Sequence, residues 1–173
     1  MRIAIIGTRT PDAKQEELAH NLAYMALTEG EWQVATGAAA GIDSVTMRAA
    51  QQAGRTDLLY LFLPWPGYNR LLIPDGARTT VYDYQKEWSQ SVYKYHPAPQ
   101  NLTKASFKLH ARNYGIVAGS NVVAAFPSKK LGGTGQGIRI AEELDIPWYV
   151  IPPEAKTLPE ELLSTIRKLN QKI

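Results

Sequence analysis

One glycine-rich segment indicates the fold most clearly, and it reads Gly132-Gly133-Thr134-Gly135-Gln136-Gly137. The apolar run at 122–126 before it predicts a buried strand, and the apolar spacing over 138–144 predicts a helix. We therefore expect the glycines in the turn between strand and helix. Because glycine adopts positive φ and has no Cβ, the free N–H groups at the helix start can face an anion such as phosphate. The other interpretation of this segment is tight packing of the turn.

The composition is that of an ordinary globular domain. The chain has 173 residues, of which 45% are hydrophobic and 20% charged, and it fits one domain. It has no cysteine, and its three histidines are too far apart in sequence for a local metal motif, so we expect no metal and no cofactor. With no apolar run of membrane-spanning length and no leader before the first apolar segment, we expect a cytoplasmic protein without membrane contact.

The charge of the chain allows an anionic partner. The formal net charge is +3 and the pI is about 9.1, but no run of five or more Lys and Arg residues occurs. Such a distribution favours a focused site for an anion over a broad basic face.

The order of the predicted elements indicates a parallel sheet. Apolar segments at 3–6, 32–36 and 58–63 predict strands, with helices at 11–29 and from about 42 to 54. A repeat of strand, small-residue loop, helix and strand implies right-handed crossovers. Since ligands bind at the carboxyl ends of such strands, the loops at Gly7, Gly37 and Gly132 should open on one edge.

Residues 64–103 interrupt this pattern and are rich in Pro, Tyr and Trp, which predicts a loop with an inserted helix. Its aromatic row, Tyr84, Trp88, Val92 and Tyr95, has helical spacing and favours core or subunit contact over base stacking. A helix at 103–119, a strand at 148–151 and a closing helix at 159–172 should follow. The expected fold class is α/β: a single doubly wound domain over 1–173 with a mostly parallel sheet and an aromatic and proline-rich insert.

The first two small-residue turns supply candidate ligand-binding residues. Arg9 follows a strand and Gly7-Thr8, where its guanidinium can fold over an anion; otherwise it is a surface arginine. In the loop from Gly37 through Ala38 to Gly41, small side chains let a phosphate or ribose approach the backbone. Asp43 either caps the following helix, the favoured interpretation, or accepts a hydrogen bond from a sugar hydroxyl.

Arg112 and Asn113 supply a cation and an amide just before the last core strand. Both can reach the glycine turn. The alternative for Arg112 is an ion pair with Glu142 or Glu143 on the next helix.

Within the glycine turn, Thr134 can donate its hydroxyl to a phosphate or cap the helix, and Lys129 and Lys130 can steer anions towards it. The chain has no Walker lysine after the glycines, no Gly-x-Ser-x-Gly elbow and no paired catalytic carboxylates at these turns. The pattern therefore favours binding over catalysis.

In this order and spacing the chain resembles the Rossmann-like domain of the DNA-processing protein A (DprA) family, within the SLOG superfamily. The resemblance covers nearly all of 1–151. It rests on Gly7-Thr8-Arg9, on Thr36-Gly37-Ala38-Ala39-Ala40-Gly41-Ile42-Asp43, on Arg112-Asn113, and on Gly132-Gly133-Thr134 followed by Ala141. It implies a Rossmann-like fold and, as one possibility, binding of single-stranded DNA.

A second SLOG branch, the LOG-type nucleoside monophosphate phosphoribohydrolases, is similar at His110-Ala111-Arg112 and at Gly132-Gly133-Thr134. Its motif places a catalytic glutamate three residues after the threonine, where this chain has Gly137. Glu142 and Glu143 are the remaining candidates for an acid. Other SLOG domains bind nucleotide-derived signals, and this chain could sense or sequester such a molecule.

We therefore expect non-catalytic binding of a phosphate-bearing nucleotide or a nucleotide-derived signalling molecule. The alternatives are single-stranded DNA binding and, third, LOG-like hydrolysis of a nucleotide N-glycoside. Because related domains pair and the insert offers an apolar surface, a homodimer or larger homo-oligomer is expected. The expected ligand contacts are Gly7, Thr8, Arg9, Gly37, Ala38, Gly41, Asp43, Arg112, Asn113, Gly132, Gly133, Thr134 and Gly135.

Overall fold

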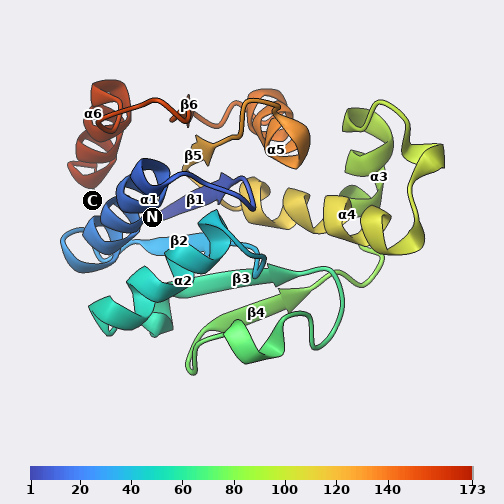
Figure 1. Cartoon of the computed structure of the whole chain (residues 1–173), viewed down its shortest axis with the longest axis horizontal. Helices are drawn as coiled ribbons and strands as arrows, with labels where there is room; N and C mark the ends of the chain where they lie inside the picture. Colours follow the sequence, from blue (N-terminus) through green and yellow to red (C-terminus); the bar gives the residue numbers. More distant parts are fainter. Residues whose placement is uncertain (173) are drawn as a thin grey trace.

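A six-stranded sheet forms the centre of the protein in a computed structural model that describes residues 1–172 (Figure 1). All neighbouring strands are parallel, in the order β4-β3-β2-β1-β5-β6. The α/β class and the doubly wound, parallel sheet are thus confirmed. The strands are β1 (Arg2–Gly7), β2 (Gln33–Thr36), β3 (Leu59–Leu63), β4 (Arg78–Val81), β5 (Val122–Phe126) and β6 (Trp148–Val150).

Helices cover both faces of this sheet. One face packs against α1 (Ala13–Thr28), α2 (Ile42–Ala53) and α6 (Glu160–Asn170). The other packs against α4 (Lys104–Ala118) and α5 (Gly132–Glu143), with α3 (Lys86–Tyr95) beside α4. Short 3-10 turns lie at Thr56–Leu58, Arg70–Leu72 and Pro99–Asn101. Within residues 1–172, every helix is too short or too polar to cross a membrane.

The central strand β1 contributes to both layers. Ile3 and Ile5 pack towards α1, α2 and α6, whereas Ala4 and Ile6 pack towards α4 and α5. Successive strand residues point to opposite faces, so a strand buried on both sides reads as a continuous apolar run. Burying one isoleucine side chain stabilises the fold by roughly 1.5–3 kcal/mol.

The strand order reverses between β1 and β5. Gly7 at the end of β1 lies opposite Phe126 at the end of β5, while the other edge of β1 pairs with β2. In open α/β sheets, the crevice outside the carboxyl ends of the strands at such a reversal is the usual ligand site. The fold therefore directs attention to the segments that follow β1 and β5.

The strand β4 was missing from the sequence prediction, which placed only a loop and a helix in residues 64–103. It pairs in parallel with β3, Tyr60 lying opposite Arg78 and Leu63 opposite Val81. The sequence Arg78-Thr79-Thr80-Val81 contains no apolar run, because most of this edge strand is exposed. Hydrophobic periodicity cannot detect such a strand.

The aromatic row of the insert divides into two parts. Val92 is buried in the core, and Trp88 and Tyr95 are partly buried against it, so the predicted core contact is confirmed for these three residues. For Tyr84 the core contact is wrong, because this residue lies before α3, has a φ of 56° and is 61% exposed; a subunit contact stays a prediction for it.

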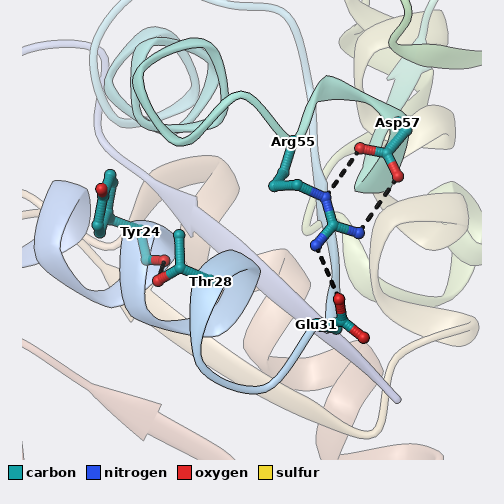
Figure 2. Close-up of polar contacts among 5 residues, drawn as sticks. All are labelled: Tyr24, Thr28, Glu31, Arg55 and Asp57. Atoms are coloured by element: carbon teal, nitrogen blue, oxygen red, sulfur yellow. Dashed lines mark hydrogen bonds and ion pairs between the residues drawn. The ribbon is translucent and has the colours of Figure 1, made fainter.

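Polar contacts tie together the opposite, amino-terminal edge of the sheet (Figure 2). Arg55, just before β3, donates from Nε to Asp57 Oδ1 at 3.1 Å and from Nη1 to Glu31 Oε1 at 3.2 Å. Nearby, the Thr28 hydroxyl donates to the Tyr24 carbonyl at 2.8 Å in the last turn of α1. These contacts are exposed and contribute little to stability. They lie at the amino-terminal ends of the strands, whereas the site described below lies at the carboxyl ends.

Candidate functional site

A cavity of about 420 Å³ opens at the carboxyl ends of β1 and β5. Its lining comes from four segments: the end of β1, the turn into α2, one face of α4, and the segment from Ser128 into α5. Of the predicted ligand contacts, the structure brings together Gly7, Thr8, Arg9, Asp43, Arg112, Asn113, Gly132, Gly133 and Thr134. Gly37, Ala38, Gly41 and Gly135 lie outside the lining.

The first turn of α5 offers unused donors to this cavity. Among residues 1–172, the backbone N–H groups of Gly132, Gly133 and Thr134 find no acceptor, and Leu131 at the N-cap provides no side-chain cap. The first N–H groups of a helix lack intrahelical partners and carry the positive end of the helix dipole. The amide of Gly135 is already bonded to the Leu131 carbonyl at 3.0 Å.

The start of α5 also corrects the sequence prediction. The glycines were expected in a turn before a helix beginning near residue 138, but the helix begins at Gly132. The low helix propensity of glycine concealed this turn. Thr134 is therefore the third residue of the helix and not its N-cap, and its buried side chain lines the cavity.

The segment after β1 offers a side-chain cation to the cavity, whereas its Thr8 backbone N–H is already bonded. The Thr8 N–H donates to the Phe126 carbonyl at 2.9 Å, continuing the strand pairing, and the Thr8 hydroxyl accepts from the Thr10 N–H at 3.1 Å. The Arg9 side chain is exposed and has no hydrogen bond or ion pair with another residue in 1–172. Its guanidinium is free to contact an anion.

Gly7 is required for packing at this point. A Cβ added there would lie 2.5 Å from Ile42 Cγ1 and 2.6 Å from the Phe126 carbonyl oxygen. Both distances are far inside van der Waals contact, so only glycine lets α2 approach the end of β1.

The turn into α2 is closed by the protein's own groups. Gly41 has a φ of 83°, and a Cβ added there would overlap the Thr8 carbonyl and lie 2.6 Å from Arg9 Cα. A Cβ at Gly37 would overlap the Arg112 guanidinium and lie 2.5 Å from Asp43 Oδ2. The Ala38 carbonyl accepts from the Asn69 side chain at 2.8 Å.

Asp43 holds this turn together. Its Oδ2 accepts from the Ala39 N–H at 3.2 Å, and its Oδ1 lies 2.8 Å from the Thr36 hydroxyl. The predicted cap on α2 is wrong, since Gly41 is the N-cap and no side chain caps the helix. Burial raises the pKa of Asp43, and the positive charge of Arg112 opposes this shift most strongly.

Arg112 is a buried cation beside Asp43, only 5% exposed. It donates from Nη1 to the Phe62 carbonyl and from Nε to Asn113 Oδ1, both at 3.0 Å. Burial lowers the pKa of Arg112, and Asp43 opposes this. The alternative of an ion pair with Glu142 or Glu143 is wrong: both glutamates are exposed, and Glu143 pairs with Lys94.

Sequence reasoning missed the contact between α4 and α5. Gln136 is buried, and its Oε1 accepts from Asn113 Nδ2 at 3.0 Å and from His110 Nδ1 at 2.7 Å. Because Gln136 Nε2 donates to the His110 carbonyl at 3.2 Å, Oε1 must accept, and Nδ1 of His110 carries the proton. Burial lowers the pKa of His110, so the ring is neutral at neutral pH. The sequence signal that could have indicated this contact is the polar Gln136 inside a glycine-rich run.

The charge of the cavity favours an anion. Arg9, Lys130 and the helix start contribute positive potential, whereas the carboxylate of Asp43 lies beside Arg112. Gly137 also lines the cavity, but a Cβ added there would lie 2.5 Å from Ile6 Cδ1. A glutamate could not be accommodated at this position unless Ile6 moved.

The family of the protein follows from comparison with known sequences. The model of the DNA recombination-mediator protein A family matches residues 1–165. The chain belongs to this family. The resemblance noted from the motifs is thereby confirmed. A comparison with curated proteins finds no match.

Solved structures share the fold. DNA processing protein A from Helicobacter pylori aligns with a TM-score of 0.66 and 20% identity, covering 99% of this chain and 79% of that one. The molybdenum cofactor carrier protein from Chlamydomonas reinhardtii gives 0.60 and 18%, covering 96% and 85%. The molybdenum cofactor binding protein from Rippkaea orientalis gives 0.60 and 17%, covering 98% and 84%. At these identities the likeness shows the fold alone.

Proposed function

We propose that the protein binds a phosphate-bearing nucleotide or nucleotide-derived molecule in the cavity between α4 and α5, without chemically changing it. The observation that carries this proposal is the unpartnered N–H groups of Gly132, Gly133 and Thr134 beside the free guanidinium of Arg9. Several N–H donors at a helix start and a neighbouring arginine form a suitable environment for phosphate. The position at the strand-order reversal supports the same proposal.

The cavity also has room for the rest of a small ligand. A volume of about 420 Å³ lies within the usual range of small-molecule sites. Leu109, Ile116 and Val117 of α4 give it an apolar wall against which a base can lie. Two of the structural neighbours are described as molybdenum cofactor carrier and binding proteins, which supports a small ligand in this fold.

The positions of the carboxylates in and near the cavity support binding without catalysis. Among the described lining residues, Asp43 is the one acid, and it is engaged with Thr36 and Ala39. Neither Glu142 nor Glu143 lines the cavity, and Gly137 occupies the position of the LOG-type glutamate. Release of adenine from AMP by the purified protein would contradict this part of the proposal.

Calorimetry with a panel of nucleotides and inorganic phosphate tests the proposal. The Arg9→Ala variant should lose about tenfold or more in affinity, the usual cost of a hydrogen bond to a charged group. The matched control is Arg48→Ala, which removes an exposed arginine of α2 outside the cavity lining and should bind as the wild type does. Absence of binding by every compound, or equal binding by Arg9→Ala, would reject the proposal.

Single-stranded DNA is the second candidate ligand. Family membership favours it, and the Helicobacter pylori structure is described as showing a single-stranded DNA binding mode of its protein. Contacts to several phosphates would make the affinity fall steeply with salt. A gel shift with a labelled oligonucleotide at two salt concentrations tests this candidate, and the absence of a shift at low salt would argue against it.

A further inference from the structure

We propose that two copies of the chain associate through β4, whose strands pair antiparallel and join the two sheets into one. The sequence led us to expect self-association through the apolar side chains of the insert, whereas this contact uses the backbone of the insert. It is independent of the proposed function, because β3 and β2 separate β4 from the strand β1 that borders the cavity.

The outer side of β4 carries backbone groups without partners. Directly after this strand, the Tyr82 N–H donates to the Leu63 carbonyl of β3 at 2.8 Å. Because alternate residues of a strand bond to the same neighbour, Arg78 and Thr80 also bond to β3, and Thr79 and Val81 direct their backbone groups outwards. Within residues 1–172, the outward N–H groups find no acceptor, and residues 78–80 are exposed.

The free groups match one another across a two-fold axis at Thr79. In an antiparallel pair centred there, the Thr79 N–H donates to the partner's Thr79 carbonyl, and the Val81 N–H donates to the partner's Ala77 carbonyl. The axis repeats both bonds, as in any contact between identical surfaces. Self-complementarity of this kind favours a second copy of the chain as the occupant of the edge.

The other groups in this register are already bonded within each copy. The Ala77 N–H donates to the Pro74 carbonyl at 3.3 Å, so it needs no acceptor from the partner. Gln85 Nε2 donates to the Val81 carbonyl at 3.1 Å. An axis moved by one residue, to Thr80, would direct the Thr79 N–H at this occupied carbonyl. The bonds inside each copy therefore select the register centred on Thr79.

The side chains at this edge are compatible with the pairing. Each Arg78 lies opposite the partner's Thr80, so like charges do not face each other directly. Leu71 and Leu72, in the turn before β4, are 94% and 51% exposed, and Figure 1 shows this turn on the outer side of the strand. Joining the two edges places the partner beside this turn and removes the leucines from water.

The opposite edge of the sheet is protected against such pairing. At that edge, β6 lies between Pro147 and the pair Pro152-Pro153. Proline has no N–H to donate and is one of the residues that prevent pairing at a sheet edge. The sequence of β4, Arg78-Thr79-Thr80-Val81, contains no proline and is rich in residues that favour strands. Of the two edges, β4 is the one open to a second strand.

This arrangement leaves both cavities open. Antiparallel pairing of β4 reverses the strand direction from one copy to the other. The carboxyl ends of the two sheets, and the cavities beside them, then lie at opposite edges of the joined sheet. Variants that separate the copies should therefore bind nucleotides as the wild type does.

Light scattering of the purified protein over a range of concentrations tests the contact. The wild type should have the mass of two chains, and Thr79→Pro should have the mass of one, because proline removes the outward N–H but keeps the bonds to β3. The matched control is Thr79→Val, which keeps the N–H and should stay dimeric. Leu71→Lys leaves the backbone intact and should weaken the dimer about tenfold or more. Urea denaturation checks that each variant is folded.

Amide hydrogen exchange locates the contact within the dimer. The N–H groups of Thr79 and Val81 should be protected at high protein concentration and exchange faster on dilution, whereas that of Thr80, bonded to β3, should be protected in both states. A wild type that is monomeric throughout would overturn the inference, as would a dimer that survives both Thr79→Pro and Leu71→Lys. Separation of the copies by Tyr93→Ala, which removes a 66% exposed ring of the insert, would place the contact on side chains and show the inference to be wrong.

Discussion

The turn into α2 and the turn into α5 both follow a parallel strand and both consist of small residues. In the turn into α2, Ala39 donates its N–H to Asp43, and Gly37 makes room for Asp43 and Arg112. In the turn into α5, Gly132 and Gly133 leave their N–H groups without an acceptor among the described residues, and a Cβ added at either position would meet no atom closer than 4.0 Å. Small residues thus serve close packing of the protein in one turn and approach of a ligand in the other.

The largest expected effect is that of Gly41→Ala in the turn into α2. Its positive φ and the overlap of an added Cβ with the Thr8 carbonyl should lower the free energy of unfolding by about 3 kcal/mol. The control is Gly54→Ala, where φ is also positive, at 64°, but an added Cβ meets nothing within 4 Å; it should cost about 1 kcal/mol. Urea denaturation measures both, and equal losses would contradict the close packing of this turn.

A matched pair of alanine substitutions sharpens the contrast between the two turns. Gly37→Ala should cost about 2 kcal/mol of stability, because the added methyl group collides with Arg112 and Asp43. Gly133→Ala should leave stability unchanged or raise it by up to about 1 kcal/mol, since alanine favours helix and the nearest atom, Asn113 Nδ2, is 4.0 Å away.

Nucleotide affinity completes this comparison. Gly133→Ala should weaken nucleotide binding measured by calorimetry although the protein is fully folded, because its methyl group stands beside the donors. A Gly133→Ala variant that binds as the wild type does would show that the ligand does not approach the α5 turn closely.

The pH dependence of stability tests the state of Asp43. Since burial raises its pKa, the folded protein holds a proton that the unfolded chain releases, and stability should fall as the pH rises from the unfolded towards the folded pKa. Asp43→Asn can keep both hydrogen bonds, with Nδ2 donating to Thr36 and Oδ1 accepting from Ala39. The variant should therefore be more stable than the wild type at neutral pH, and the difference should vanish in acid. A variant that is less stable at neutral pH would contradict the raised pKa.

The smallest expected effect is that of Lys130→Ala beside the α5 turn. Lys130 is exposed at the cavity, so its charge acts through solvent and should change nucleotide affinity only about two- to threefold at low salt. The difference should disappear at high ionic strength, where charges are screened. An effect that persists in high salt would mean that Lys130 contacts the ligand directly.

Local sequence patterns predicted the parts of the fold that are local. The apolar runs of β1 and β5 and the glycines after them located both strands that flank the cavity, and Arg9 could be placed beside it. The beginning of α5 could not be predicted, because glycine disfavours the helix that its position in the fold nevertheless imposes.

The contacts that complete the site join residues far apart in sequence. Asp43 and Arg112 come from α2 and α4, and the Gln136 side chain joins α4 to α5 through His110. Spacing along one helix does not reveal such partners, so sequence reasoning left Arg112 between ligand contact and an ion pair with the glutamates of α5, and did not identify Asp43 as its neighbour. Burial and the three-dimensional course of the chain decide these contacts.

The most direct test of the phosphate site is an amide NMR titration of the protein with a nucleoside monophosphate. The account predicts that the N–H resonances of Gly132, Gly133 and Thr134 shift as they gain an acceptor, while that of Ala39, already bonded to Asp43, stays in place. Shifts at Ala39 with none in the first turn of α5, or no shifts in either turn, would contradict it.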